Sequence, residues 1–242
     1  MNGLLCCDLS LPTIEENLAC DEALLDWCES QDQAEILRLW EPSEFSVVLG
    51  YANRAATETN LDYCVANGIR VRRRCSGGGT VLQGPGCLNY AVVLRIEPGT
   101  PLETIHGTNT FVMERHRMTL ERLLGKPVEL CGHTDLALGG LKFSGNAQRR
   151  KRRCLIFHGT FLLSLDLAYV EGALRMPSKQ PDYRRGRGHL RFITNLGLDR
   201  SAVKAALRQC WGAGEDLKTL PAVKIQELVR TKYSLPEWNL KF

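Results

Sequence analysis

The spacing of apolar and polar positions predicts several amphipathic helices. Residues 12–26 and 102–124 carry apolar side chains three and four positions apart, which gives each segment one apolar face. Thr13 followed by Glu16 is typical of a helix start, and Gly68 is typical of a helix end. The expected helices are residues 12–26, 61–67, 102–124, 167–174, 201–211 and 222–232.

Short apolar runs between these helices predict strands. Pro42 with Ser43, and Gly139 with Gly140, are turn residues that predict hairpins between the runs on either side of them. The expected strands are residues 34–40, 46–50, 69–73, 80–82, 88–96, 135–138, 141–143 and 156–165. Because strands and helices do not alternate regularly, their order favours an α+β domain with a mixed or antiparallel sheet over a doubly wound one.

The composition is that of a soluble globular protein. The chain has 242 residues, of which 44% are hydrophobic and 24% charged, and this balance excludes a disordered or collagen-like chain. No stretch approaches the roughly 18 consecutive apolar residues of a membrane helix. Residues 1–11 contain Asp8 and lack a basic segment before their apolar run, so we expect no secretory signal and a cytoplasmic location.

The net charge of +4 requires neither a nucleic acid nor a membrane as partner, although the positive charge is unevenly distributed. Segments 70–74, 148–153 and 184–191 are rich in arginine and lysine, and the ordinary interpretation of such a segment is a solvated face. The ten cysteines include no C-x-x-C pair. We therefore expect reduced, mostly buried thiols in a reducing compartment.

Three successive glycines, Gly77 to Gly79, lie between two expected strands and follow Arg73 and Arg74. Each glycine weakens a sheet, so the run favours a loop that a ligand approaches closely. Backbone N–H groups in such a loop can converge on an anion, and arginines nearby can bind phosphate or carboxylate. The loop is neither a Walker loop nor a Rossmann glycine motif, and a plain glycine-rich turn is the alternative.

Two further segments contain polar residues on expected strands. In an alternating strand Leu141 and Phe143 share one face, so Lys142 occupies the other face, just before a turn at Ser144 and Gly145. A lysine at a sheet edge can reach a ligand, although a solvent-facing lysine is the simpler interpretation. His158 stands beside Gly159 and Thr160 on another strand, and a lone histidine of this kind is more often structural than catalytic.

Together these segments resemble the catalytic domain of the lipoate–protein ligase family. The matching motifs, in order, are Arg73 to Val81, Asn89 with Tyr90, Lys142 to Ala147, and His158 to Leu162. The resemblance covers nearly the whole chain. It implies the α+β fold of the biotin and lipoate ligases, with a mixed sheet flanked by helices, and residues 1–242 forming one catalytic domain without a separate accessory domain.

The resemblance implies an enzyme that activates lipoate or octanoate with MgATP as an acyl-adenylate. The acyl group then passes to a lysine of a lipoyl-domain protein, such as a 2-oxoacid dehydrogenase E2 subunit or the glycine cleavage H protein. Lys142 would be the catalytic cation, contacting the acyl carbonyl and the α-phosphate. The substrate phosphates would hold Mg²⁺, with Asp135 as a candidate ligand. The residues implied in nucleotide and acyl binding are Arg74, Ser76, Gly77, Gly78, Gly79, Thr80, Val81, Leu82, Asn89, Asp135, Ser144, Gly145, Ala147, His158, Gly159 and Thr160.

The chain departs from the family at residues 83–86, Gln-Gly-Pro-Gly, where ligases often have a His-Asp pair. The alternative function is an octanoyl or lipoyl transferase, which takes the acyl group from a carrier or lipoyl protein through a cysteine thioester. Cys131, upstream of Lys142, is its candidate nucleophile, whereas residues 175–178 lack the cysteine of a second transferase branch. The presence of Lys142 disfavours a third class, a non-catalytic binding protein.

Overall fold

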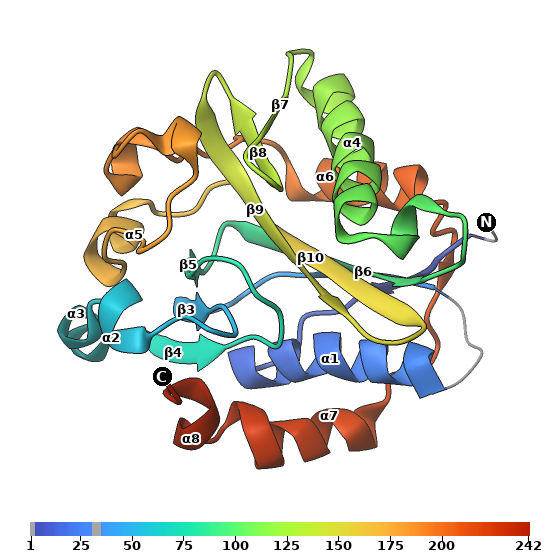
Figure 1. Ribbon diagram of the computed structural model, residues 1–242, viewed down its shortest axis with the longest axis horizontal. Helices are drawn as coiled ribbons and strands as arrows, with labels where there is room; N and C mark the ends of the chain where they lie inside the picture. The colour runs from blue at the N-terminus through green and yellow to red at the C-terminus, as the bar shows by residue number, and fades with distance from the viewer. Residues whose placement is uncertain (1–2, 31–34) are drawn as a thin grey trace.

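The computed structural model describes residues 3–30 and 35–242, and within this part of the chain the strands form two sheets (Figure 1). The eight-stranded sheet has the order β11-β1-β2-β6-β10-β9-β8-β7, and the three-stranded sheet the order β4-β3-β5. The larger sheet contains β1 (Leu5–Asp8), β2 (Ile36–Trp40), β6 (Cys87–Arg95), β7 (Glu129–Cys131), β8 (Asp135–Leu138), β9 (Leu141–Arg150), β10 (Cys154–Leu162) and β11 (Glu215–Asp216). The smaller sheet contains β3 (Ser46–Leu49), β4 (Arg70–Arg73) and β5 (Val81–Gln83).

Both sheets are mixed. In the larger one β1 runs parallel to β2 and β11, whereas the pairs from β2 through β6, β10, β9 and β8 to β7 are antiparallel. In the smaller sheet β3 is parallel to β4 and antiparallel to β5. The α+β class with a mixed sheet, expected from the order of the elements, is therefore confirmed.

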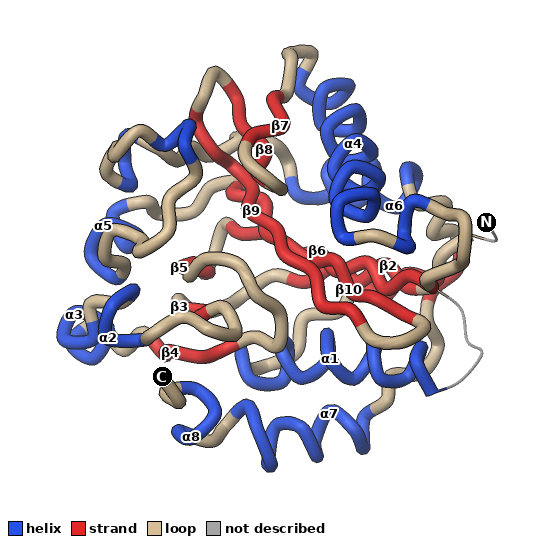
Figure 2. The backbone as a smooth tube through the Cα atoms, in the orientation of Figure 1, coloured by secondary structure: helices blue, strands red, loops and turns tan. Residues whose placement is uncertain are grey.

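Helices cover both faces of the larger sheet (Figures 1 and 2). Helix α1 packs on one face with α7 against its outer side, and α4 and α6 pack on the other face. Short helices α2, α3 and α5 lie beside the smaller sheet. The helices are α1 (Ile14–Ser30), α2 (Ala55–Glu58), α3 (Leu61–Ala66), α4 (Ile105–Leu124), α5 (Ala168–Ala173), α6 (Arg200–Cys210), α7 (Ala222–Leu228) and α8 (Pro236–Asn239), and a π-helical turn, Val229–Tyr233, follows α7.

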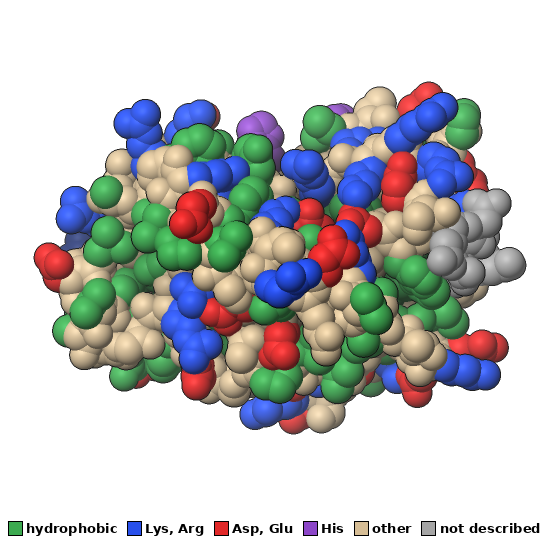
Figure 3. Space-filling model, turned by 90° about the horizontal axis from the view of Figure 1, so that it is seen from below, with side chains coloured by type: hydrophobic (Ala, Val, Ile, Leu, Met, Phe, Trp, Pro, Cys, Tyr) green, Lys and Arg blue, Asp and Glu red, His purple; other side chains and the backbone are tan. Residues whose placement is uncertain are grey.

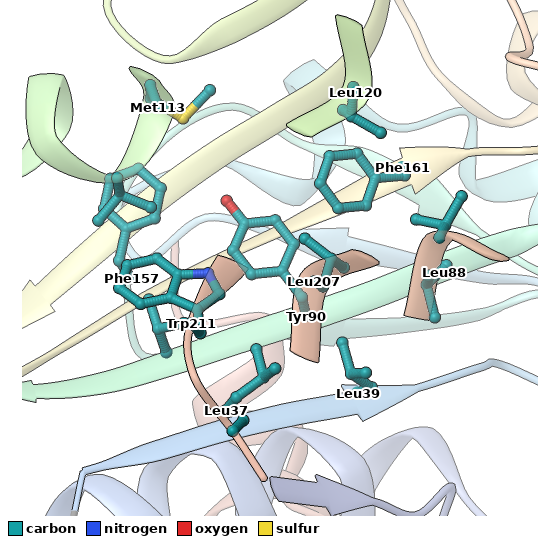
Figure 4. Close-up of a cluster of buried hydrophobic side chains, with 14 of the residues drawn as sticks. Leu37, Leu39, Leu88, Tyr90, Met113, Leu120, Phe157, Phe161, Leu207 and Trp211 are labelled. Atoms are coloured by element: carbon teal, nitrogen blue, oxygen red, sulfur yellow. The ribbon is translucent and has the colours of Figure 1, made fainter. Parts of the chain in front are cut away.

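Strand alternation divides the core into two layers. On β6, Leu88 and Tyr90 face α4 and α6, where they meet Phe161 and Trp211, and Ala91 faces α1 (Figure 4).

Helix α1 begins with the capping contacts that the sequence predicts. The N–H of Thr13 donates to Glu16 Oε2 at 2.9 Å, and the N–H of Glu16 donates to Thr13 Oγ1 at 3.2 Å.

The hairpin expected around Pro42 and Ser43 is wrong. Strand β2 pairs with β1 and β6 in the larger sheet, whereas β3 joins β4 and β5 in the smaller one. Both strands are buried along their whole length, so each needs neighbours of its own on both sides and the turn passes the chain from one sheet to the other. Ala34, the expected first residue of β2, lies outside the described residues.

The turn expected at Ser144 and Gly145 is also absent from the described structure. Strand β9 continues through both residues to Arg150, because β10 pairs with it from Leu155 opposite Arg150 to Phe161 opposite Ser144. The basic residues Arg149 and Arg150 thus belong to a strand. The sequence pattern also did not indicate the short strands β1, β7 and β11.

Candidate active site

The glycine loop is built around the side chain of Arg74. Its Nη2 donates to the carbonyls of Gly77 at 2.6 Å and Gly79 at 2.8 Å, and its Nη1 donates to the carbonyl of Val48 at 3.2 Å. Nε donates to Ser76 Oγ at 3.1 Å. Burial lowers the pKa of Arg74 to about 10. Each guanidinium nitrogen therefore already has a protein acceptor, and the cation orders the loop from within.

The loop needs glycine at a point of close approach. Gly78 has a φ of +85°, and a Cβ there would lie 2.9 Å from Arg74 Nη2. A Cβ at Gly50, at the end of β3, would come within 2.1 Å of the Gly78 carbonyl oxygen. Gly77 and Gly79 have open space around them. Their backbone can therefore be approached from outside.

The other arginines of this segment serve the fold. Arg73 is fully buried and donates to the carbonyls of Gly50, Tyr51, Asn53, Trp238 and Asn239. Arg72 pairs with Glu15 of α1 at 2.5 Å, and Arg70 contacts the same carboxylate at 3.4 Å. The segment is therefore not the solvated basic face that its charge alone suggests.

The side chain of Lys142, on β9, is held by an ion pair with Asp135. Its Nζ lies 2.8 Å from Asp135 Oδ1, and Asp135 Oδ2 accepts a hydrogen bond from the hydroxyl of Tyr183 at 2.7 Å. Burial and the charge of Asp135 raise the pKa of Tyr183. A Cβ at Gly145 would lie 2.7 Å from Lys142 Nζ, so a glycine is needed for the ammonium to occupy this position.

Two adjoining cavities, of about 490 Å³ and about 110 Å³, meet at Lys142. Thr80, Val81, Gly145 and Thr160 line both cavities as well. The larger cavity has the size of a small-molecule site. Among the predicted residues, the larger cavity is also lined by Arg74, Gly78, Gly79, Asn89, Asp135, Ala147, His158 and Gly159, and the smaller by Leu82 and Ser144.

Two of the predicted residues do not line a cavity. Ser76 is buried behind the loop, where its Oγ lies 2.6 Å from His158 Nε2, and Gly77 is exposed. The structure also adds residues that the motifs did not indicate. Trp40 and Asp21 line the larger cavity, and Asp21 is a charged residue on the buried side of an amphipathic helix. A charge at such a position is the signal that could have revealed it.

Gln83, where the chain departs from the family pattern, belongs to a cluster of hydrogen-bonded polar side chains. Gln83 Nε2 donates to Asn89 Oδ1 at 3.0 Å and to Thr160 Oγ1 at 3.1 Å, and the Thr160 hydroxyl donates to Asn89 Oδ1 at 2.5 Å. All three side chains line or adjoin the larger cavity. Gln83 thus fixes two of the predicted site residues, Asn89 and Thr160.

Cys131, the alternative nucleophile, lies at the end of β7 and lines neither cavity. Its Sγ lies 3.9 Å from a carboxylate oxygen of Glu129. Burial raises the pKa of the Cys131 thiol, and the charges of Glu129 and Asp135 raise it further. The thiol therefore lacks the cationic surroundings that generate a reactive thiolate. Of the ten cysteines, eight are buried, as the sequence predicts.

In the described part of the chain, no helix is long and apolar enough to span a bilayer. Across residues 3–30 and 35–242, no group of three or more His, Cys, Asp or Glu side chains is arranged to hold a metal ion.

On the face that carries α7 and α8, basic side chains lie among acidic ones (Figure 3). Lys232, in the turn between α7 and α8, pairs with Glu22 of α1 at 2.7 Å.

The chain is similar to known proteins over most of its length. The family model of the lipoyl protein ligase A/B catalytic domain matches residues 13–203. Lipoate-protein ligase A subunit 1 of Thermoplasma acidophilum is 27% identical over 93% of this chain and 91% of its own length. Octanoyltransferase LipM of Brevibacillus brevis is 23% identical over 93% of this chain and 94% of its own length.

Solved structures share the whole fold. A structure of lipoate-protein ligase A bound with ATP superposes with a TM-score of 0.83, at 26% identity over 99% of each chain. A chain from the study of a bi-partite lipoate protein ligase and its E2 lipoyl domain from Thermoplasma acidophilum gives 0.84, at 26% identity over 99% of this chain and 96% of that chain. A T. acidophilum structure with bound lipoic acid gives 0.84 at 25% identity, over 99% of this chain and 100% of that chain.

The fold and these similarities place the chain in the class of the lipoate ligases and octanoyltransferases. Within that class, the chain belongs to the lipoyl protein ligase A/B catalytic domain family, whose model covers most of its length. The family expected from the motifs, and the enzyme class that follows from it, are therefore confirmed.

Proposed function

We propose that the protein is an ATP-dependent lipoate–protein ligase. It joins the carboxylate of lipoate or octanoate to the α-phosphate of ATP with release of pyrophosphate, and then transfers the acyl group to a lysine of a lipoyl domain with release of AMP. The observation that carries this proposal is the position of Lys142 in the lining of both cavities. The lipoic acid and ATP bound in the related structures support the same pair of substrates.

Lys142 would act through its charge. Phosphoryl transfer and acyl transfer both develop negative charge on oxygen, and a preorganised cation stabilises it. In the free protein the ammonium rests against Asp135 at 2.8 Å. We propose that the carboxylate and α-phosphate oxygens of the substrates replace this contact, while Tyr183 keeps Asp135 in place.

The larger cavity suits the acyl group. Leu18, Trp40 and Val48 give it an apolar side, and Arg74 and Gly79 lie at its glycine loop. We propose that the acyl chain occupies this space with its carboxylate toward Lys142. The nucleotide would lie along the loop, with the predicted residues 77–82 near its phosphates.

The chemistry of the site suits Mg²⁺ that arrives with ATP. Mg²⁺ is usually bound by substrate phosphates and one or two carboxylates, without a dedicated protein cage. Asp135 offers one carboxylate beside Lys142. We propose Asp135 as the residue closest to the metal ion, which would neutralise charge on the phosphates.

The acceptor is proposed to be a lipoyl-domain protein, such as a 2-oxoacid dehydrogenase E2 subunit or a glycine cleavage H protein. The T. acidophilum relative, studied with its E2 lipoyl domain, supports this class of partner. We also propose that the reaction takes place in the cytoplasm.

The second candidate function is an octanoyl or lipoyl transfer through a thioester on Cys131. The similarity to LipM over nearly the whole chain favours it. The position of Cys131 outside both cavities and its raised pKa favour the ligase instead.

A pair of assays separates the two functions. For the ligase, we expect lipoate-dependent exchange of ATP with pyrophosphate, and Cys131→Ser should retain activity within about twofold, because the thiol touches no substrate. The acylation of a lipoyl domain is measured with lipoate and MgATP, and separately with octanoyl-carrier protein. Loss of activity in Cys131→Ser, together with an acyl thioester on Cys131 in the mass spectrum, would establish the transferase.

A further inference from the structure

A chain of buried polar side chains lies behind the glycine loop, and the proposed chemistry leaves its role unassigned. Arg38 Nη1 donates to Asp21 Oδ1 at 2.5 Å, and Asp21 Oδ2 lies 3.1 Å from His158 Nδ1. His158 Nε2 lies 2.6 Å from Ser76 Oγ. Arg38 and Ser76 have no exposed surface, and Asp21 and His158 are 3% and 8% exposed. The chain joins β2, α1 and β10 to the loop.

The carboxylate of Asp21 sets the direction of these hydrogen bonds. Burial opposes its charge, but Arg38 and His158 stabilise that charge and lower the pKa of Asp21. An ionised carboxylate only accepts hydrogen bonds, so the hydrogen facing it belongs to Nδ1 of His158. In the neutral ring, Nε2 is then an acceptor and the hydroxyl of Ser76 donates to it.

Ser76 connects His158 to the glycine loop through Arg74. Its Oγ accepts from Arg74 Nε at 3.1 Å while its hydrogen is directed to His158. Arg74 in turn holds the carbonyls of Gly77 and Gly79 at 2.6 and 2.8 Å. Glycines lose the most conformational freedom on ordering, so a loop of this kind depends on such anchors.

We propose that Asp21 and His158 are positioning residues for the glycine loop: Asp21 holds a hydrogen of His158 on Nδ1, so that Nε2 accepts from Ser76, and His158 fixes Ser76 and, through Arg74, the loop beside the acyl cavity. The link from loop order to substrate binding rests on the proposed function. The tautomer and the anchoring of the loop do not.

The order serine–histidine–aspartate is also that of a hydrolase triad. Here the serine is not a nucleophile, because Ser76 is fully buried and lines neither cavity. Its oxygen also already accepts a hydrogen bond from Arg74. The triad therefore holds a loop and makes no covalent bond.

The tautomer is measured on the free wild-type protein. Long-range proton–nitrogen NMR of ¹⁵N-histidine-labelled full chain reports which ring nitrogen carries hydrogen, and the His158 signals are those lost in His158→Gln. We expect hydrogen on Nδ1 and none on Nε2. A ring with hydrogen on Nε2 alone, or on both nitrogens at neutral pH, overturns the proposal. This result is independent of whether the protein exchanges ATP with pyrophosphate.

The anchoring is measured with two variants. Asp21→Asn keeps the shape of the side chain but can donate to Nδ1, which leaves Nε2 protonated and removes the acceptor of Ser76. We expect amide hydrogen exchange at residues 76–80 to rise about tenfold, since the hydroxyl hydrogen of Ser76 is left buried without its acceptor. We expect KM for lipoate to rise more than kcat falls. In the single variant His158→Gln the side-chain oxygen of glutamine can accept from Ser76. This variant should keep most of the wild-type protection that Asp21→Asn loses.

The matched control is His116→Gln. His116 is also a fully buried histidine, but it lies in the core between α4 and α6, on the opposite face of the sheet from α1. This variant should lose stability and keep wild-type exchange at residues 76–80. Unchanged loop exchange in Asp21→Asn, equal changes in the control, or labelling of Ser76 by a fluorophosphonate probe would each overturn the proposal.

Discussion

At the scale of single residues, Lys142 and Asp135 neutralise each other across 2.8 Å in the free protein. The pair is mostly buried, with 25% of the lysine side chain and 13% of the aspartate side chain exposed. A buried charge is costly when it loses its partner. A ligand must therefore bring an anionic oxygen of its own to replace Asp135 beside the ammonium.

Lys142→Ala should abolish acyl transfer and leave the fold intact. Loss of a cation at developing charge lowers the rate by about 100-fold or more. Activity is measured as lipoylation of a lipoyl domain, and folding by the melting temperature. The control is Lys204→Ala, because Lys204 is a similarly buried lysine that pairs with Asp8 and Glu41 at 2.8 Å. Turnover above about a tenth of wild type in Lys142→Ala would remove it from the catalytic role.

At the scale of elements, the sequence predicted the helices and strands whose pattern depends on residues close together in the chain. Lys142 could be assigned a face because strand alternation fixes it, and α1 could be started at Thr13 because its capping contacts span three residues. The hairpin of β2 and β3 could not be excluded, because the choice of partner strand depends on residues far along the chain. The use of Arg73 inside the fold could not be predicted either, since its acceptors lie near residues 50–53 and 238–239.

The packing of α4 on α6 makes stability depend on pH. His116 of α4 accepts a hydrogen bond from Trp211 Nε1 at 2.9 Å, and burial with the charge of Arg115 lowers its pKa from 6.5 to about 3. The unfolded chain binds a proton that the folded protein does not, so this contribution is complete above pH 6.5. It is lost as the pH falls toward 3, at up to about 1.4 kcal/mol per pH unit.

His116→Gln should therefore flatten the pH dependence. Between pH 6.5 and about pH 5, we expect the wild type to lose about 2 kcal/mol more of its free energy of unfolding than the variant does. Urea denaturation at each pH measures it. His106→Gln, at an exposed histidine of the same helix, should keep the wild-type slope. Equal slopes in wild type and His116→Gln would show that His116 is not the group responsible.

At the scale of the whole molecule, the cavities lie between parts of the chain that are distant in sequence. Residues of α1, β2, the glycine loop, β9, β10 and the loop after α5 all line the larger one. A ligand that contacts all of them stabilises the folded state as a unit. The loop of residues 176–189 and the glycine loop supply most of the arginine and glycine residues that line the larger cavity. We expect both loops to become more ordered when a ligand binds.

A non-hydrolysable lipoyl-adenylate analogue should raise the melting temperature by about 5 °C or more at saturation. Arg74→Glu should remove most of this shift, because the loop loses its central cation. Arg187→Glu, in the loop of residues 176–189, should remove less. Each shift is measured against the free form of the same variant, and hydrogen exchange locates the protection. The absence of a shift in wild type, or equal losses in the two variants, would contradict this assignment of the loop.

The backbone of Lys142 is fastened to a remote part of the chain. Its N–H donates to the carbonyl of Phe192 at 2.8 Å, and its carbonyl accepts from the N–H of Thr194 at 2.9 Å. For protein engineering, this bridge makes residues 143–191 a closed loop whose two ends meet at Lys142. A circular permutation or an inserted label near either end would shift the ammonium itself. The exposed turn at Gly125, which ends α4 with open space around it, is the better place to open the chain.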